Sequence, residues 1–115
     1  MEADISARLD MGMKKYGHGV RVNDDTRSWG TSMNSWLEMA REEFLDAVIY
    51  VVADYIRQGR SSRDGVSKME AEYGGDTAGD DNGLISFIVS GRDRMEACRH
   101  KVLLWNLANM LRVAR

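Results

Sequence analysis

One stretch of the chain, residues 35–57, constrains the fold more than any other. It reads SWLEMAREEFLDAVIYVVADYIR and contains neither glycine nor proline. Ser35 and Glu38 have the spacing of a capping box, in which two side chains satisfy the free backbone donors at a helix start. Gly59, just beyond the stretch, is typical of a helix end. The pattern predicts one helix roughly 35 Å long, enough to cross a small domain.

The two halves of this predicted helix differ in character. With Glu38 as the origin and about 100° per residue, Glu42 lies at ~40° and Asp46 at ~80°. Glu43 lies further round, at ~140°. Apart from Asp46, residues 44–53 are apolar on nearly every side, which is typical of a buried helix. Carboxylates at the entrance to a buried segment are costly unless a positive charge meets them.

Two interpretations of these acids are open. They can hold a divalent cation, since Mg²⁺ takes oxygen ligands and is usually bound by a few carboxylates together with substrate phosphates. They can instead form a solvated face, because acids near a helix start complement the helix dipole. Spacing alone does not decide between the two.

Length and composition limit the class of protein. A chain of 115 residues predicts a single domain over residues 1–115, and a net charge of −2 argues against a general nucleic-acid binder. Cys98 is the only cysteine, which fits a reducing compartment. The apolar run 44–56 is interrupted by Asp46 and Asp54 and is too short to span a bilayer. We therefore expect a cytoplasmic protein with no signal peptide that binds neither nucleic acid nor membrane.

The remaining segments predict an all-α fold, since the chain contains no proline. Residues 2–15 form a first helix, with apolar residues at every fourth position, and a last helix runs from Arg92 to Val113. Residues 84–89 are a short apolar run that is either a buried helical turn or a strand. Residues 59–83 are rich in glycine and acids and are predicted to be a flexible loop.

A polar loop over residues 16–31, together with Lys15 before it, concentrates cations and aromatic rings. That mixture can bind a phosphorylated aromatic ligand, with cations for the phosphates and rings for a base. It is equally typical of an ordinary loop with two anchoring aromatics. The residues concerned are Lys15, Tyr16, Arg21, Arg27 and Trp29.

Residues 42–50, EEFLDAVIY, resemble the E-E-L-x-D-x-x-x-Y helix of the all-α nucleoside triphosphate pyrophosphohydrolases, the superfamily of MazG, the dimeric dUTPases and dCTP pyrophosphatase. The sequence K-Y-G at 15–17 and the W-L-E at 36–38 resemble small MazG-like proteins common in bacteriophages. The similarity covers residues 5–58, roughly half of the chain. It implies a MazG-like helical bundle of three long helices and a short one, completed by assembly into a homodimer or homotetramer.

The resemblance also implies an activity. Members of this superfamily use Mg²⁺ or Mn²⁺ to cleave a nucleoside triphosphate between the α- and β-phosphates, which gives a nucleoside monophosphate and pyrophosphate. We expect the same reaction here on a (d)NTP, with a purine deoxynucleotide as the preferred substrate, in control of the nucleotide pool.

Site residues carry over by motif. The catalytic residues implied are Glu43, Asp46 and Glu42, and the metal ligands implied are Glu38, Glu42, Glu43 and Asp46. For the substrate, Tyr50 matches the tyrosine of the motif, Lys15, Arg21 and Arg27 are phosphate-binding candidates, and Trp29 or Trp36 is placed to stack on the base.

The chain departs from the family pattern in one respect. The family carries an E-x-x-E on the helix before its E-x-x-D, and residues 1–37 contain none. Three substitutes are open: Glu38 and Glu42 on the same helix, Asp93 and Glu96 near the last helix, or acids from a partner chain.

Two other functions follow from that departure. A non-catalytic helical dimer, acting as a binding or regulatory module, would keep the fold without turnover. A related enzyme acting on a different pyrophosphate, such as a phosphoribosyl nucleotide, would keep the metal and change the product.

Overall fold

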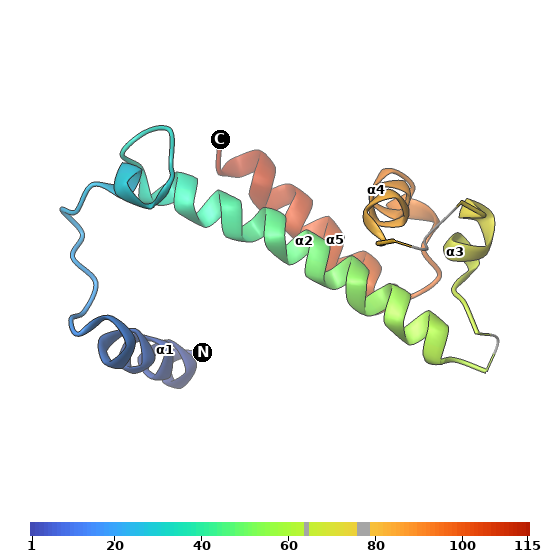
Figure 1. Ribbon diagram of the computed structural model, residues 1–115, viewed down its shortest axis with the longest axis horizontal. Coiled ribbons are helices and arrows are strands. Elements are labelled where there is room, and N and C mark those ends of the chain that lie inside the picture. The colour runs from blue at the N-terminus through green and yellow to red at the C-terminus, as the bar shows by residue number, and fades with distance from the viewer. Residues whose placement is uncertain (64, 76–78) are drawn as a thin grey trace. The chain divides into compact units, whose positions relative to one another are not determined.

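The structure is a computed structural model that describes residues 1–63, 65–75 and 79–115. Its regular elements are five α-helices and two short 3₁₀ helices, and the described residues form no strand (Figure 1). The prediction of an all-α fold is confirmed. The chain divides into two compact units, Met1–Ser35 and Trp36–Arg115.

The first unit begins with α1, Glu2–Tyr16, in agreement with the predicted first helix. Gly17 ends it in the left-handed conformation, with φ of 79°, and donates its N–H to the Met13 carbonyl at 2.9 Å. Glycine suits this position because it has no Cβ to clash there. No residue of α1 is buried.

The second element of this unit is the 3₁₀ helix η1, Thr26–Trp29, held by a buried threonine pair. The hydroxyls of Thr26 and Thr31 lie 2.8 Å apart. The Ser35 N–H donates to the Thr26 hydroxyl at 2.8 Å, and the Thr26 N–H donates to the Asn34 side chain at 3.0 Å. These bonds fix the chain directly before the next helix begins.

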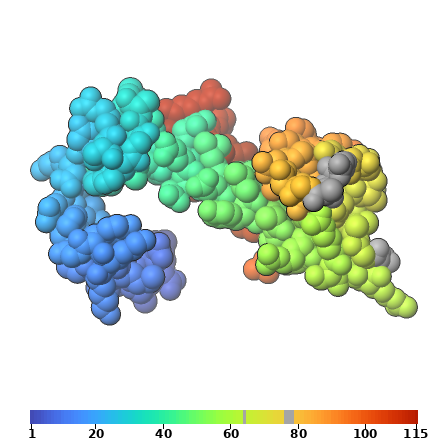
Figure 2. Space-filling view, in the orientation of Figure 1, coloured from blue at the N-terminus to red at the C-terminus, as the bar shows by residue number. Residues whose placement is uncertain are grey.

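In the second unit, α2 (Trp36–Ser61) and α5 (Cys98–Val113) lie side by side and antiparallel (Figure 1). The short helices α3 (Lys68–Tyr73) and α4 (Asn82–Ser90) contact each other, and α4 contacts α2. Figure 2 shows α3 and α4, in yellow and orange, as one compact body.

The apolar core of this unit gathers around the C-terminal half of α2. It consists of Val52, Tyr55, Ile56, Met69, Leu84, Ile88, Met95 and Leu104. No residue of α2 before Val52 is buried, and the middle of this helix lies at the surface in Figure 2. The expectation of a buried second half is therefore met only from Val52 onward. Among the described helices, none is long and apolar enough to cross a membrane.

The expected helix end at Gly59 is wrong, because α2 continues to Ser61. A Cβ built on Gly59 would lie 2.6 Å from the backbone nitrogen of Ser67, so the missing side chain is what lets the following chain pack against α2. Arg60 then holds this end by ion pairs with Glu70 at 2.7 Å and Asp81 at 2.9 Å.

The expected loop over residues 59–83 is also corrected, since it contains α3 and the end of α2. The Ser67 hydroxyl caps α3 by accepting the Glu70 N–H at 3.1 Å. Met69 anchors it, with 0% of its surface exposed. The fold thus has two short helices where one was expected. Residues 64 and 76–78 lie outside the described part of this segment.

Two further predictions are resolved near the C-terminus. Residues 84–89, left open between helix and strand, lie in α4. The last helix begins at Cys98 and not at Arg92, because Arg92–Arg94 form a separate 3₁₀ helix, η2. Met95 then adopts an extended conformation and is buried in the core. Burial of its side chain is favourable by roughly 1.5–3 kcal/mol, which offsets the break in the helix.

Candidate functional site

The predicted metal ligands lie on the first turns of α2. Glu42, Glu43 and Asp46 are exposed, and Glu38 is half-buried. At 1.5 Å per residue the four acids extend over about 12 Å of helix. Helical geometry alone brings them to one side, as the sequence predicts.

Three of these acids have no compensating charge in the described structure. The side chains of Glu42, Glu43 and Asp46 form no ion pair or hydrogen bond with a described residue. Like charges four residues apart on a helix destabilise it by a few tenths of a kcal/mol per pair. A bound cation would remove this repulsion between Glu42 and Asp46.

The donor chemistry of this arc fits Mg²⁺ or Mn²⁺, which take carboxylate oxygens. Among the described residues, no group of three acidic, histidine or cysteine side chains converges as a metal site would require. A single ion on α2 would thus take its first ligands from a pair such as Glu43 and Asp46. Mg²⁺ usually completes its coordination with water and substrate phosphates, so such a pair is an adequate starting set.

The second candidate acid pair is engaged elsewhere in the chain. The carboxylate of Asp93 accepts the indole N–H of Trp105 at 3.1 Å. The carboxylate of Glu96 accepts the hydroxyl of Tyr55 at 2.8 Å, and Tyr55 lies twelve residues after Glu43, or roughly 18 Å along α2. Within one chain, Asp93 and Glu96 therefore do not join the arc.

The aromatic candidates of the second unit flank the acids. Tyr50 follows Asp46 by one helical turn, and 67% of its surface is exposed. Trp36 is the first residue of α2, two positions before Glu38, and is also exposed. Both rings are accessible to a ligand bound at the arc.

The loop candidates belong to the first unit, where all five are exposed: Lys15, Tyr16, Arg21, Arg27 and Trp29. The Lys15 ammonium lies 5.3 Å from the ring centre of Tyr16. Arg27 forms a two-pronged ion pair with Asp25, whose side chain also caps η1. Hydrogen bonds from the Arg27 side chain hold the pKa of Asp25 at about 2. A phosphate that binds Arg27 must compete with this carboxylate.

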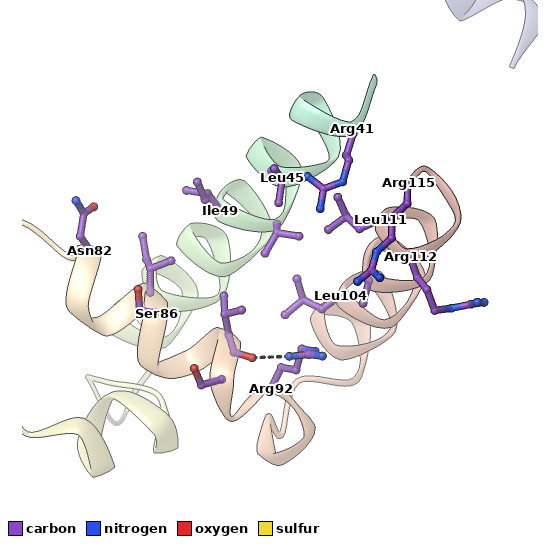
Figure 3. Close-up of a pocket in the computed structure, with 15 residues that line it drawn as sticks. Arg41, Leu45, Ile49, Asn82, Ser86, Arg92, Leu104, Leu111, Arg112 and Arg115 are labelled. Carbon is purple, nitrogen blue, oxygen red and sulfur yellow. Dashed lines mark hydrogen bonds between the residues drawn. The ribbon is translucent and has the colours of Figure 1, made fainter. Parts of the chain in front are cut away.

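Sequence reasoning missed a groove between α2, α4 and α5, about 760 Å³ in volume. Its walls include Leu45 and Ile49 of α2 and Leu104 and Leu111 of α5 (Figure 3). Four arginines line it, namely Arg41, Arg92, Arg112 and Arg115. None of the described lining residues is acidic. The only local signal was the apolar spacing of each helix, and the order of the helices in space was not readable from it.

A second missed feature is a buried histidine that joins α2 to α5. Nε2 of His100 lies 2.7 Å from the Asp54 carboxylate, which only accepts, so this nitrogen carries the proton. Nδ1 is buried and forms no hydrogen bond with a described residue. The ring also stacks edge-on against Tyr55, at 5.7 Å between ring centres. These contacts indicate a structural role, and 46 residues of separation hid the pair from sequence patterns.

Comparison of the chain with models of protein families, with curated proteins and with solved structures found no match. The family resemblance consequently depends on the motif residues themselves. The geometry of α2 is the part of the structure that bears on those residues.

Proposed function

We propose that the protein is a metal-dependent nucleoside triphosphate pyrophosphohydrolase of MazG-like type. It converts a (d)NTP, with a purine deoxynucleotide preferred, to the (d)NMP and pyrophosphate. It acts as a homodimer or homotetramer on the cytoplasmic nucleotide pool. The observation that carries the proposal is the group of three exposed carboxylates on α2 that form no ion pair with a described residue, Glu42, Glu43 and Asp46, followed one turn later by the exposed Tyr50.

In this proposal Glu43 and Asp46 bind Mg²⁺ or Mn²⁺, with Glu42 and Glu38 beside them. A bound divalent ion neutralises charge on phosphate oxygens and lowers the pKa of a coordinated water. Glu42, one helical turn before Asp46, would accept the proton of the attacking water, as a nearby carboxylate can. The Tyr50 hydroxyl contacts the substrate, and the exposed ring of Trp36 stacks on the base.

The test is a panel of (d)NTPs with Mg²⁺ and then Mn²⁺, with nucleotide products separated by ion exchange. Wild type is compared with Glu43→Gln and with the control Glu72→Gln, which alters only an exposed ion pair with Arg94. We expect monophosphate and pyrophosphate from wild type and control, and a loss of at least about 100-fold in the Glu43 variant. Diphosphate and orthophosphate as products would contradict the proposal, as would the absence of turnover with either metal.

The second candidate function is a non-catalytic helical dimer that binds or regulates another molecule. It is favoured by one observation: Asp93 and Glu96, which would supply the second acid pair within a chain, are bonded to Trp105 and Tyr55 instead. The absence of both metal binding and turnover on the panel would favour this function, whereas metal binding without turnover would favour a related enzyme that acts on a different pyrophosphate.

A further inference from the structure

Helix α1 carries an apolar stripe that nothing in its own unit covers. Ile5, Leu9, Gly12 and Tyr16 follow the spacing i, i+4, i+7, i+11, which aligns them on one face of a helix. Leu9 is 52% exposed, and no residue of α1 is buried. This is the pattern of a helix that binds into an apolar groove.

The second unit has a groove of matching character. Leu45 and Ile49 line it on α2 and are both exposed, Ile49 at 45%, while Leu111 and the core residue Leu104 line it on α5 (Figure 3). Hydrophobic side chains left open between packed helices mark a place for a further helix.

The charges of the two surfaces are complementary. Residues 2–10 of α1 carry Glu2, Asp4 and Asp10 against the single cation Arg8. The groove, by contrast, carries four arginines with no described acid among its lining residues. Three of them, Arg41, Arg112 and Arg115, gather at one end of the groove, and Asn82 and Ser86 lie at the other (Figure 3). Charge thus selects an orientation in which the acidic start of α1 lies at the arginine end.

We propose that the groove of one copy binds α1 of a second copy, and that the exchange is reciprocal. A two-fold symmetric pair forms this contact twice, which is the usual form of a homodimer interface. The inference concerns assembly alone, and it does not depend on turnover or on a metal.

The choice of a second copy follows from how much apolar surface needs covering. On α5, Leu103 and Met110 lie about 100° or more round the helix from Leu104, and both are exposed. A helix in the groove leaves this flank open, and in a reciprocal pair the body of the second copy is available to cover it. An acyl chain or other small anion in the groove would leave both α1 and the flank uncovered.

The first experiment is sedimentation equilibrium of the full chain, with circular dichroism to monitor helix content. Leu9→Asp places a charge on the stripe, and Ile49→Asp places one in the groove. Ala7→Asp is the matched control, since residue 7 lies on the opposite side of α1. We expect dimers for wild type and control, and a dissociation constant raised about 100-fold or more in the other two, with helix content retained. Leu9 lies outside the apolar core, so its variant tests the interface even if Ile49→Asp fails to fold.

Mixing the two disrupted variants then tests the exchange itself. Leu9→Asp retains an intact groove and Ile49→Asp retains an intact α1, so together they can form one of the two contacts. We expect the mixture to form a heterodimer more tightly than either variant self-associates. A mixture that stays monomeric would show that α1 is not exchanged between copies and would overturn the proposal. A monomeric wild type, or one whose native mass includes a bound small molecule in place of a partner, would overturn it too.

Discussion

A single carboxylate, Glu96, joins three segments of the second unit. It accepts the Tyr55 hydroxyl of α2 at 2.8 Å and the backbone N–H of Lys68, at the start of α3, at 3.3 Å. Burial acts to raise the pKa of Glu96, but hydrogen bonds from its own backbone, Tyr55 and Lys68 outweigh that effect and lower the pKa. Glu96 is therefore held as an anion at the junction, and a metal ion there would compete with these hydrogen bonds for its oxygens.

Titration of Tyr55 makes the stability of this junction depend on pH in the alkaline range. Burial is the main cause that raises the pKa of Tyr55 from 10.0 to about 12. Because the folded state disfavours the phenolate, the neutral form stabilises the protein below pH 10, and this contribution is lost as the pH rises toward 12. Tyr55→Phe removes the titration and, at neutral pH, costs about 1 kcal/mol through the lost bond to Glu96.

The measurement is denaturant unfolding of wild type and Tyr55→Phe at a series of alkaline pH values. We expect wild type to lose stability more steeply than the variant in that range. Tyr16→Phe, at an exposed position, serves as the control and should follow wild type. Identical slopes for wild type and Tyr55→Phe would show that the hydroxyl is not shielded in solution.

Asp46 is the residue at which structural and catalytic roles separate most cleanly. Its side chain is exposed and forms no described ion pair, so Asp46→Asn should change stability by no more than about 0.5 kcal/mol. The same change should abolish metal-dependent turnover. It should also weaken Mn²⁺ binding by about tenfold or more, because the ion loses a charged carboxylate ligand. Titration of Mn²⁺ by calorimetry, beside circular dichroism, checks both parts. Unfolding of the variant would instead make Asp46 structural.

At the scale of elements, the sequence predicts best what depends on local spacing. The position of α1 follows from apolar periodicity, and the start of α2 from the spacing of Ser35 and Glu38. The arc of acids from Glu38 to Asp46 follows from the pitch of the helix. Helix ends were predicted less well because they depend on distant contacts. Helix α2 runs past Gly59, whose missing side chain leaves room for Ser67, and Met95 interrupts the last helix where its side chain enters the core.

The same reason limits prediction of the site. Whether Asp93 and Glu96 meet the acids of α2 depends on where the last helix begins, which periodicity did not reveal. The arginines of the groove come from α2, η2 and α5 with its C-terminal end, and they meet only once those segments are packed. Neither hydrophobic periodicity nor motif spacing in the sequence predicts that these arginines lie together.

Gly59→Ala tests the packing of α2 against the chain that follows it. In a free helix, alanine is favoured over glycine by about 1 kcal/mol. Here the added Cβ would lie 2.6 Å from the Ser67 nitrogen, so we expect a net loss of about 1–3 kcal/mol. Thermal and denaturant unfolding of the variant give the value. Arg57→Ala, an exposed position two residues earlier, is the control and should stay within about 0.5 kcal/mol of wild type. A stabilised Gly59→Ala would mean that the Ser67 contact yields readily.

At the scale of the whole molecule, buried apolar surface is distributed unevenly. All eight core residues belong to the second unit, whereas the buried residues of Met1–Ser35 are two threonines, Thr26 and Thr31. The hydrophobic effect is the main favourable contribution to folding. The first unit by itself therefore gains little of it, and a surface that covers Ile5 and Leu9 would add to the stability of its helix.

The proposed exchange of α1 would make stability a function of protein concentration. If a second copy supplies the covering surface, folding and association are linked, and the melting temperature of wild type rises as the protein is concentrated. Leu9→Asp removes the link, so we expect a lower melting temperature that is independent of concentration. Ala7→Asp, on the opposite face of α1, should behave as wild type. Scanning calorimetry over about a hundredfold range of concentration measures all three. A wild-type melting temperature that does not move with concentration would contradict the exchange of α1 between two copies.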